Sequence, residues 1–238
     1  MEIRGRRAIV LGGSAGIGLA TARQLLEAGA EVVVASRRAA SRERAAQALG
    51  ARATRRDVDV LDRTALEALF EEFAPFDILV CSATGGGRAM GPFLEMDLDG
   101  FQGSFRKLWG YTNAVRLGAP KMGPDGTIVL VSGYPARKAL PGSSALCAVG
   151  SAVEGFARAI APEIAPRRIN VMSPGAIATE LITEDEAARD RILVEATRSN
   201  PIPRAGTADE AASAVLFLIR NDFVTGTTVD VDGGALLP

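Results

Sequence analysis

The sequence predicts an α/β protein in which helices cover both faces of a single doubly wound parallel sheet. Seven short runs rich in valine and isoleucine have the continuous apolar character of strands that are buried on both faces. Between these runs, apolar residues recur with the period of a helix, as at Leu66, Leu69 and Phe73. Strands and helices that alternate in this way join through right-handed crossovers. Because no linker or repeat divides residues 1–238, we expect one domain.

Segments of helical period lie between the expected strands. A helix expected over Gly103–Ala119 precedes the fifth strand, and Ala212, Val215 and Ile219 mark the helix before the seventh. The expected strands are Arg7–Leu11, Glu31–Ala35, Ala51–Arg55, Asp77–Cys81, Thr127–Ser132, Ile169–Ser173 and Thr228–Val231.

The charge balance argues against several kinds of partner. Twenty-seven basic residues face 28 acidic ones, so the net charge of −1 gives no attraction to nucleic acid or to an anionic membrane. No apolar run approaches the roughly 18 residues of a membrane span. Residues Met1–Arg7 lack a signal-peptide core, and two cysteines are too few for a disulfide framework. We therefore expect a cytoplasmic protein with a small-molecule substrate.

The inventory of reactive side chains is small. The chain has no histidine, which removes Ser-His-Asp and Cys-His catalysis together with histidine-ligated metals, and no metal cofactor is expected. Lysine occurs only at Lys107, Lys121 and Lys138, and tyrosine only at Tyr111 and Tyr134. Chemistry that needs a lysine or a tyrosine must use one of these positions.

A glycine-rich turn links the first expected strand to the first helix. Its glycines allow positive φ and a close approach of the backbone, and free N–H groups at the start of the following helix attract an anion. The spacing differs from the general G-x-G-x-x-G pattern, but the position between strand and helix is that of a dinucleotide phosphate site. The residues expected there are Gly12, Ser14, Ala15, Gly16, Ile17 and Gly18.

The end of the second expected strand indicates which dinucleotide binds. An acidic residue at this place would hold the adenosine ribose hydroxyls, and here Ser36, Arg37 and Arg38 stand instead. A carboxylate would repel a 2′-phosphate, whereas guanidinium groups bind one through charge-assisted hydrogen bonds. We therefore expect NADP(H) as the cofactor.

With these motifs in place, the sequence resembles the short-chain dehydrogenase/reductase family of Rossmann-type enzymes along nearly its whole length. The glycine turn has that family's spacing, and residues 231–234 (Val-Asp-Gly-Gly) match its closing signature. The resemblance implies a homodimer or homotetramer and suggests a substrate lid over residues 180–203. It further implies cofactor contacts from Asp57, Val58, Ser82, Ala83 and Thr84, and from the nicotinamide-capping segment at Pro174, Gly175, Ile177 and Thr179.

The resemblance does not extend to the family's catalytic residues. Aligned without gaps between residues 141–144 and 151–155, the sequence has Leu146 where the family has its tyrosine and Gly150 where it has its lysine. Gly133 takes the place of the serine, and Lys107 that of the asparagine. We therefore expect an atypical active site that lacks the Asn-Ser-Tyr-Lys tetrad.

The sequence does contain a literal Y-x-x-x-K at Tyr134 and Lys138, but we do not expect it to replace the missing pair. The family's spacing works because both residues lie on one helix face, whereas Pro135 and the preceding strand indicate a loop. Tyr134 and Lys107 nevertheless remain the two candidate catalytic residues, as polar groups near the substrate.

Three functions stay open at this stage. The first is a reductase that transfers hydride without the usual acid–base pair, to an iminium or another activated C=N or C=C acceptor. The second is a carbonyl reductase in which Tyr134 or Lys107 replaces the proton donor. The third is an NADP(H)-binding protein without redox turnover, or a repurposed catalyst. The nicotinamide-capping segment favours the first two.

Overall fold

The structure, a computed structural model, describes residues 1–37, 39–183 and 185–238; the side chains of residues 40–42 are also left undescribed. Its centre is a seven-stranded sheet in the order β3-β2-β1-β4-β5-β6-β7, and every neighbouring pair is parallel. The strands are β1 Arg7–Leu11, β2 Glu31–Ala35, β3 Ala53–Arg56, β4 Phe76–Cys81, β5 Met122–Val131, β6 Arg168–Pro174 and β7 Thr228–Val231.

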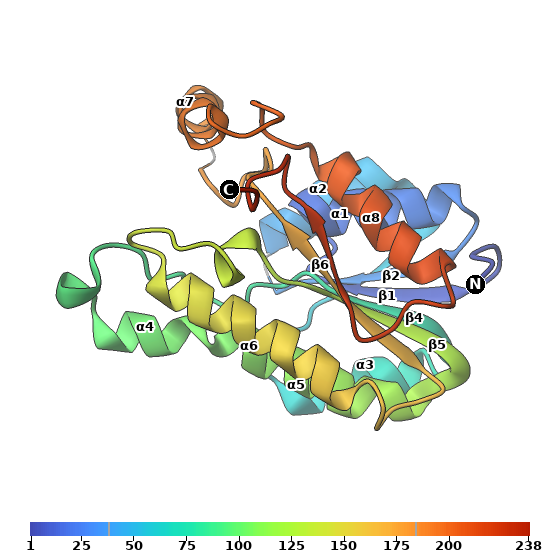
Figure 1. The fold of residues 1–238 in the computed structure, drawn as a ribbon. Helices are drawn as coiled ribbons and strands as arrows, with labels where there is room; N and C mark the ends of the chain where they lie inside the picture. The colour runs from blue at the N-terminus through green and yellow to red at the C-terminus, as the bar shows by residue number, and fades with distance from the viewer. Residues whose placement is uncertain (38, 184) are drawn as a thin grey trace.

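Helices cover both faces of this sheet. Figure 1 shows α1, α2 and α8 on one face and α3, α5 and α6 on the other, so the expected doubly wound Rossmann-type fold is confirmed. None of the described helices is long and apolar enough to cross a membrane. The helices are α1 Gly16–Glu27, α2 Ala39–Leu49, α3 Arg63–Glu72, α4 Leu98–Ser104, α5 Arg106–Gly118, α6 Ser144–Ile160, α7 Glu186–Thr197 and α8 Ala208–Arg220.

The strands divide their side chains between two hydrophobic cores. In β1, Ile9 and Leu11 pack into the core beneath α3, α5 and α6, whereas Ala8 and Val10 pack into the core beneath α1 and α8. Successive side chains of a strand point to opposite faces, so a strand buried on both faces must be apolar throughout. This arrangement explains the continuous apolar runs in the sequence.

Three of the expected elements differ from the structure by more than one residue, and several other strand ends differ by one residue. The third strand begins at Ala53, because residues 50–52 form a short 3-10 turn, and the fifth begins earlier, at Met122. The helix expected over Gly103–Ala119 is two helices, α4 and α5, which meet at Phe105. The Phe105 N–H donates to the carbonyl of Gln102 at 3.0 Å, which closes a tight turn between the two helices.

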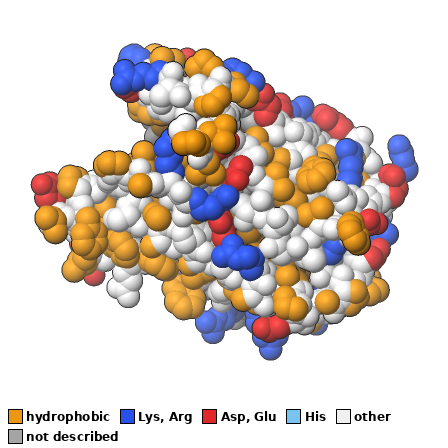
Figure 2. All heavy atoms as spheres, in the orientation of Figure 1, with side chains coloured by type: hydrophobic (Ala, Val, Ile, Leu, Met, Phe, Trp, Pro, Cys, Tyr) orange, Lys and Arg blue, Asp and Glu red, His pale blue; other side chains and the backbone are white. Residues whose placement is uncertain are grey.

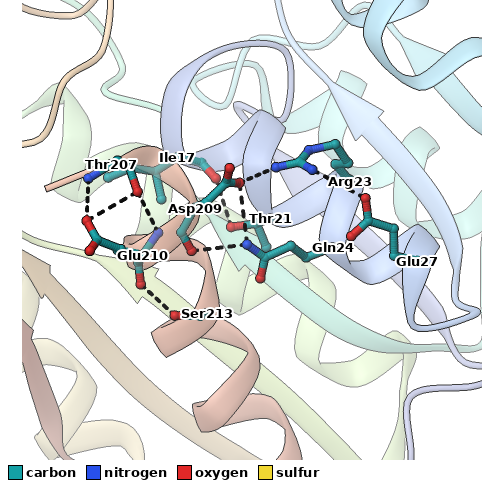
Figure 3. A network of polar contacts seen from close by, with 9 residues as sticks. All are labelled: Ile17, Thr21, Arg23, Gln24, Glu27, Thr207, Asp209, Glu210 and Ser213. Atoms are coloured by element: carbon teal, nitrogen blue, oxygen red, sulfur yellow. Dashed lines mark hydrogen bonds and ion pairs between the residues drawn. The ribbon is translucent and has the colours of Figure 1, made fainter.

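A polar network ties α1 to α8 across one face of the sheet (Figure 3). The Arg23 guanidinium pairs with the Asp209 carboxylate, and the Gln24 side chain donates to the Asp209 carbonyl at 3.0 Å. A capping box begins α8: the Glu210 N–H donates to the Thr207 hydroxyl at 3.1 Å, and the Thr207 N–H donates to the Glu210 carboxylate at 2.8 Å. The helix that starts at the glycine turn is thus held by residues from the last part of the chain.

Candidate active site

Two adjoining cavities lie at the carboxyl ends of the strands, next to the point between β1 and β4 where the order of strands reverses. This is where doubly wound sheets bind their ligands. The first cavity has a volume of about 290 Å³ and the second about 610 Å³. In the space-filling view, the lobe that carries α7 overhangs the part that carries α4 and the start of α6 (Figure 2). The two cavities share Ile17, Thr84, Lys107, Ser132, Pro174, Thr179 and Leu181.

The glycine turn forms one wall of the first cavity through its main chain. Gly12 has φ of +81°, and a Cβ there would lie 2.6 Å from the Ala83 nitrogen. A Cβ at Gly18 would lie 2.2 Å from the Gly12 carbonyl oxygen. The residue before α1, Ala15, offers no side-chain cap, so the first N–H groups of the helix have no side-chain acceptor there. A backbone cradle at a helix N-terminus is suited to the pyrophosphate of a dinucleotide.

Most of the predicted cofactor residues line the first cavity. Gly175 and Ile177 line only the second cavity. Gly18 lines neither, because its α-carbon packs on the Gly12 carbonyl, and the exposed Asp57 also lies outside both. Arg38 lies outside the described residues. The predicted residues in the first cavity are Gly12, Ser14, Ala15, Gly16, Ile17, Ser36, Arg37, Val58, Ser82, Ala83, Thr84, Pro174 and Thr179.

The first cavity also contains charged residues that the sequence analysis missed. Asp59 and Arg44 line it, and the Asp59 carboxylate pairs with the Arg37 guanidinium at 3.3 Å. Asp59 lies beyond the end of β3, so the alternation of side chains in the strand does not extend to it. Arg44 lies in α2, and nothing in the sequence pattern indicated that it would line the cavity. A 2′-phosphate at this end of the cavity would compete with Asp59 for Arg37.

Lys107 stands where the two cavities meet. It is the second residue of α5, and its Nζ donates to the Ser132 carbonyl at 3.1 Å and lies 5.7 Å from the centre of the Tyr111 ring. Gly85 packs against the backbone before it, since a Cβ there would lie 2.7 Å from the Arg106 carbonyl. Burial, with a smaller contribution from the Arg88 charge, lowers the pKa of Lys107 to about 8.

Tyr134 lines the second cavity but not the first. It begins a 3-10 turn, Tyr134–Ala136, and burial raises the pKa of its phenol. The Lys138 ammonium donates to the Ala235 carbonyl at 2.5 Å, and Lys138 lines neither cavity. The expectation that Tyr134 and Lys138 do not share a helix face is therefore confirmed.

The wall of the second cavity includes Gly133, Leu146 and Gly150, none of which carries an ionisable group. A Cβ at Gly150 would lie 2.8 Å from the Ala136 Cβ, so no larger residue fits there without a shift. The Ser132 hydroxyl donates to the Gly150 carbonyl at 3.2 Å. Lys107 and Tyr134, the two candidate catalytic residues, line the same cavity, together with Arg88 and several hydroxyl side chains.

Comparison with known proteins identifies the family. A family model described as enoyl-(acyl carrier protein) reductase matches residues 12–235. L-xylulose reductase from Mesocricetus auratus is 30% identical over 100% of this chain and 99% of its own. A solved short chain dehydrogenase/reductase family protein is 33% identical over all of both chains, with a TM-score of 0.87. A small-chain dehydrogenase solved in complex with NADPH is 29% identical over 98% of this chain and 100% of its own, with a TM-score of 0.84. The chain therefore belongs to the short-chain dehydrogenase/reductase family of oxidoreductases.

Proposed function

We propose that the protein is an NADP(H)-dependent reductase that works without the family's Tyr–Lys pair and uses Lys107 as the charged group at the substrate oxygen. One observation carries this proposal: among the described residues, Lys107 is the only ionisable side chain that lines both cavities. A group in that position faces cofactor and substrate together. Its ammonium has one acceptor, the Ser132 carbonyl, and keeps further N–H bonds for a ligand.

The first cavity fits the cofactor that this proposal requires. At Gly12 the turn packs directly against the backbone of Ala83, which holds the main chain that lines the cavity, and Arg37 and Arg44 supply positive charge at the other end. The relative that was solved with NADPH supports the choice of cofactor. When bound, the nicotinamide supplies the hydride. We propose that Ser82, Ala83, Thr84, Pro174, Gly175, Ile177 and Thr179 hold its half of the dinucleotide, and Asp57, Val58, Ser36, Arg37 and Arg38 the adenosine half.

In this proposal Lys107 supplies the proton for carbonyl reduction. As negative charge builds on the substrate oxygen, an N–H bond of the Lys107 ammonium breaks and an O–H bond forms, which leaves a neutral amine that solvent reprotonates. For a conjugated C=C acceptor, the same ammonium would stabilise the enolate oxygen. Tyr134, on the other cavity wall, would donate a second hydrogen bond or orient the substrate.

The positive charge of the second cavity favours some hydride acceptors over others. An iminium carries positive charge and would meet the Lys107 and Arg88 cations, so a neutral carbonyl or conjugated C=C bond is favoured. A role in NADP(H) binding without turnover remains an outcome of the test below. Under that alternative, Lys107 would still affect ligand binding but no reduction would occur.

Two further features complete the proposal. Residues 180–203 act as a lid over the substrate, because Leu181 and Leu193 from this segment line the second cavity. Phe93, Leu98 and Trp109 are large apolar side chains exposed to solvent, and contact with a second copy of the chain would cover them, which supports a homodimer or homotetramer. We retain a cytoplasmic location as an expectation from the composition.

The test compares the parent protein with two variants on NADPH and a panel of ketones, enones and iminium ions. We expect Lys107→Met to lower kcat by about 100-fold and Tyr134→Phe to lower it less, with NADPH affinity nearly unchanged in both. Since Lys107 acts in its charged form, parent activity should be complete below its pKa of about 8 and fall as pH rises through that value. Lys121→Met, which removes a lysine paired with Glu71 outside both cavities, is the control.

Full kcat in both active-site variants would overturn the donor role and favour a substrate that supplies its own charge. Tight NADPH binding with no oxidation by any acceptor would favour the non-redox alternative. A parent pH profile that stays flat through pH 8 would also count against Lys107.

A further inference from the structure

The second cavity has an unbalanced charge. Within the described part of the chain, its lining contains two cations, Arg88 and Lys107, and no carboxylate. Most of the remaining wall is apolar, including Met90, Leu140, Leu146, Val149, Ile177 and Leu193. A cavity of this kind is complementary to an apolar molecule that carries a negative charge.

Arg88 is the cation that the proposed function leaves unused. Its side chain is exposed at the edge of the cavity and, in the described structure, makes neither a hydrogen bond nor an ion pair, although partial desolvation by the surrounding protein lowers its pKa. Arg168 differs from Arg88 because it is buried, and burial lowers its pKa. Its guanidinium donates to three main-chain carbonyls, those of Leu218, Ile219 and Val224, at 2.8 to 2.9 Å. An arginine at a cavity mouth with no such acceptors keeps all its donors for a ligand.

The two cations also act on each other. The Arg88 charge contributes to the lowered pKa of Lys107, so the two groups are near enough to repel. An anion bound beside Arg88 would offset this repulsion and favour the protonated form of Lys107. Arg88 lines only the second cavity, whereas Lys107 lines both. The anion would therefore lie on the side of the reducible group that faces away from the cofactor.

We propose that Arg88 binds the carboxylate of the substrate, which is an apolar carboxylic acid with its reducible carbonyl or C=C bond at the Lys107 end. A planar carboxylate matches the fork of a single guanidinium through two parallel hydrogen bonds, and the apolar wall accommodates the hydrocarbon body. The assignment of a reducible group rests on the proposed function, whereas the binding of an apolar carboxylate does not. The site is thus open to a test that needs no turnover.

The binding test uses octanoate and its uncharged analogue methyl octanoate, titrated calorimetrically into the protein with NADPH present. We expect the parent to bind octanoate at least about tenfold more tightly than the ester, and Arg88→Gln to remove that preference. Arg88→Lys keeps the charge but loses the fork and should retain part of the preference. The control is Arg116→Gln, which removes an exposed charge from the last turn of α5, outside both cavities.

Equal binding of acid and ester by the parent, or an unchanged preference in folded Arg88→Gln, would overturn the carboxylate site. Tighter binding of octyl phosphate than of octanoate would replace the carboxylate by a phosphate and overturn the substrate class. Circular dichroism of each variant shows whether a loss of binding reflects unfolding.

A second measurement separates this site from the proposed function. With a 3-oxo acid and its methyl ester as paired substrates, Arg88→Gln should lower kcat/KM for the acid about tenfold and leave the ester unchanged. If neither substrate is reduced but octanoate binding still depends on Arg88, the anion site stands and the reductase proposal fails. If ketones are reduced through Lys107 with no preference for acids, the reductase stands and the carboxylate site fails.

Discussion

The two cavities share part of their lining but differ in how much main chain and how many side chains form the rest. The cradle of the first is main chain, and at Gly12 any side chain would collide with the backbone at Ala83. The second is bounded by side chains from loops and helices, such as Arg88, Tyr134 and Leu146. A cavity formed by backbone tolerates few substitutions, whereas one formed by side chains changes its ligand with each replacement. The class of cofactor therefore follows from the fold in this protein, whereas the substrate depends on individual residues.

Adding one methyl group to the main-chain wall of the first cavity should cause the greatest loss of cofactor affinity. Gly12→Ala places a Cβ 2.6 Å from the Ala83 nitrogen and demands a φ that L-residues rarely adopt. We expect NADPH affinity to fall by about 100-fold, measured by fluorescence titration. Gly103→Ala, whose Cβ would meet nothing within 4 Å, should bind NADPH like the parent. A folded Gly12→Ala protein with parental affinity would show that the close backbone approach does not limit this site.

Placing the family's lysine at Gly150, in the wall of the second cavity, should lower the stability of the protein. Gly150→Lys forces a Cβ to within 2.8 Å of the Ala136 Cβ, and overpacking of this kind costs about 2 kcal/mol of unfolding free energy. Urea denaturation measures this cost. Gly155→Ala on the same helix meets only the end of the Arg158 side chain, at 4.0 Å, and should stabilise by up to about 1 kcal/mol. Equal stability of Gly150→Lys and the parent would mean that Ala136 moves aside freely.

The smallest expected effect concerns cofactor choice, where side chains act even in the first cavity. The parent should prefer NADPH to NADH by about tenfold, through charge-assisted contacts of Arg37 with the 2′-phosphate. Combining Ser36→Asp with Arg37→Ala should reverse this preference, as measured by the two dissociation constants. Arg52→Ala, an exposed arginine outside both cavities, is the control. Equal affinities of the parent for the two cofactors would contradict the prediction.

The fold was predicted from local pattern, and so were most of the residues that gather around the first cavity. Strands buried on both faces must be apolar, and a phosphate turn must contain glycine, so β1 and the turn from Gly12 to Gly18 can be recognised without knowledge of tertiary contacts. The side chains of the second cavity could not be ranked in the same way. Arg88 is one of many arginines in the sequence, and only the folded chain distinguishes it from Arg168, whose donors are occupied.

The break between α4 and α5 was missed for a related reason. Apolar residues continue at helical spacing through Phe101, Phe105 and Leu108, so the periodicity gives no boundary. The Trp109 N–H still donates to the Phe105 carbonyl at 3.1 Å, which keeps the helical pattern nearly continuous past the turn. Such a small change in direction depends on what the two helices pack against, and that information is not local.

The network between α1 and α8 has a consequence for how the protein is made. Arg23 and Asp209 lie 186 residues apart, so α1 leaves the ribosome long before the helix that holds it. Until α8 arrives, the apolar face of α1 around Leu25 has no cover from that helix, which makes the nascent chain a candidate for chaperone binding. Contacts of such high sequence separation also slow folding. The glycine turn, although encoded early, should therefore gain its full support only after α8 has been synthesised.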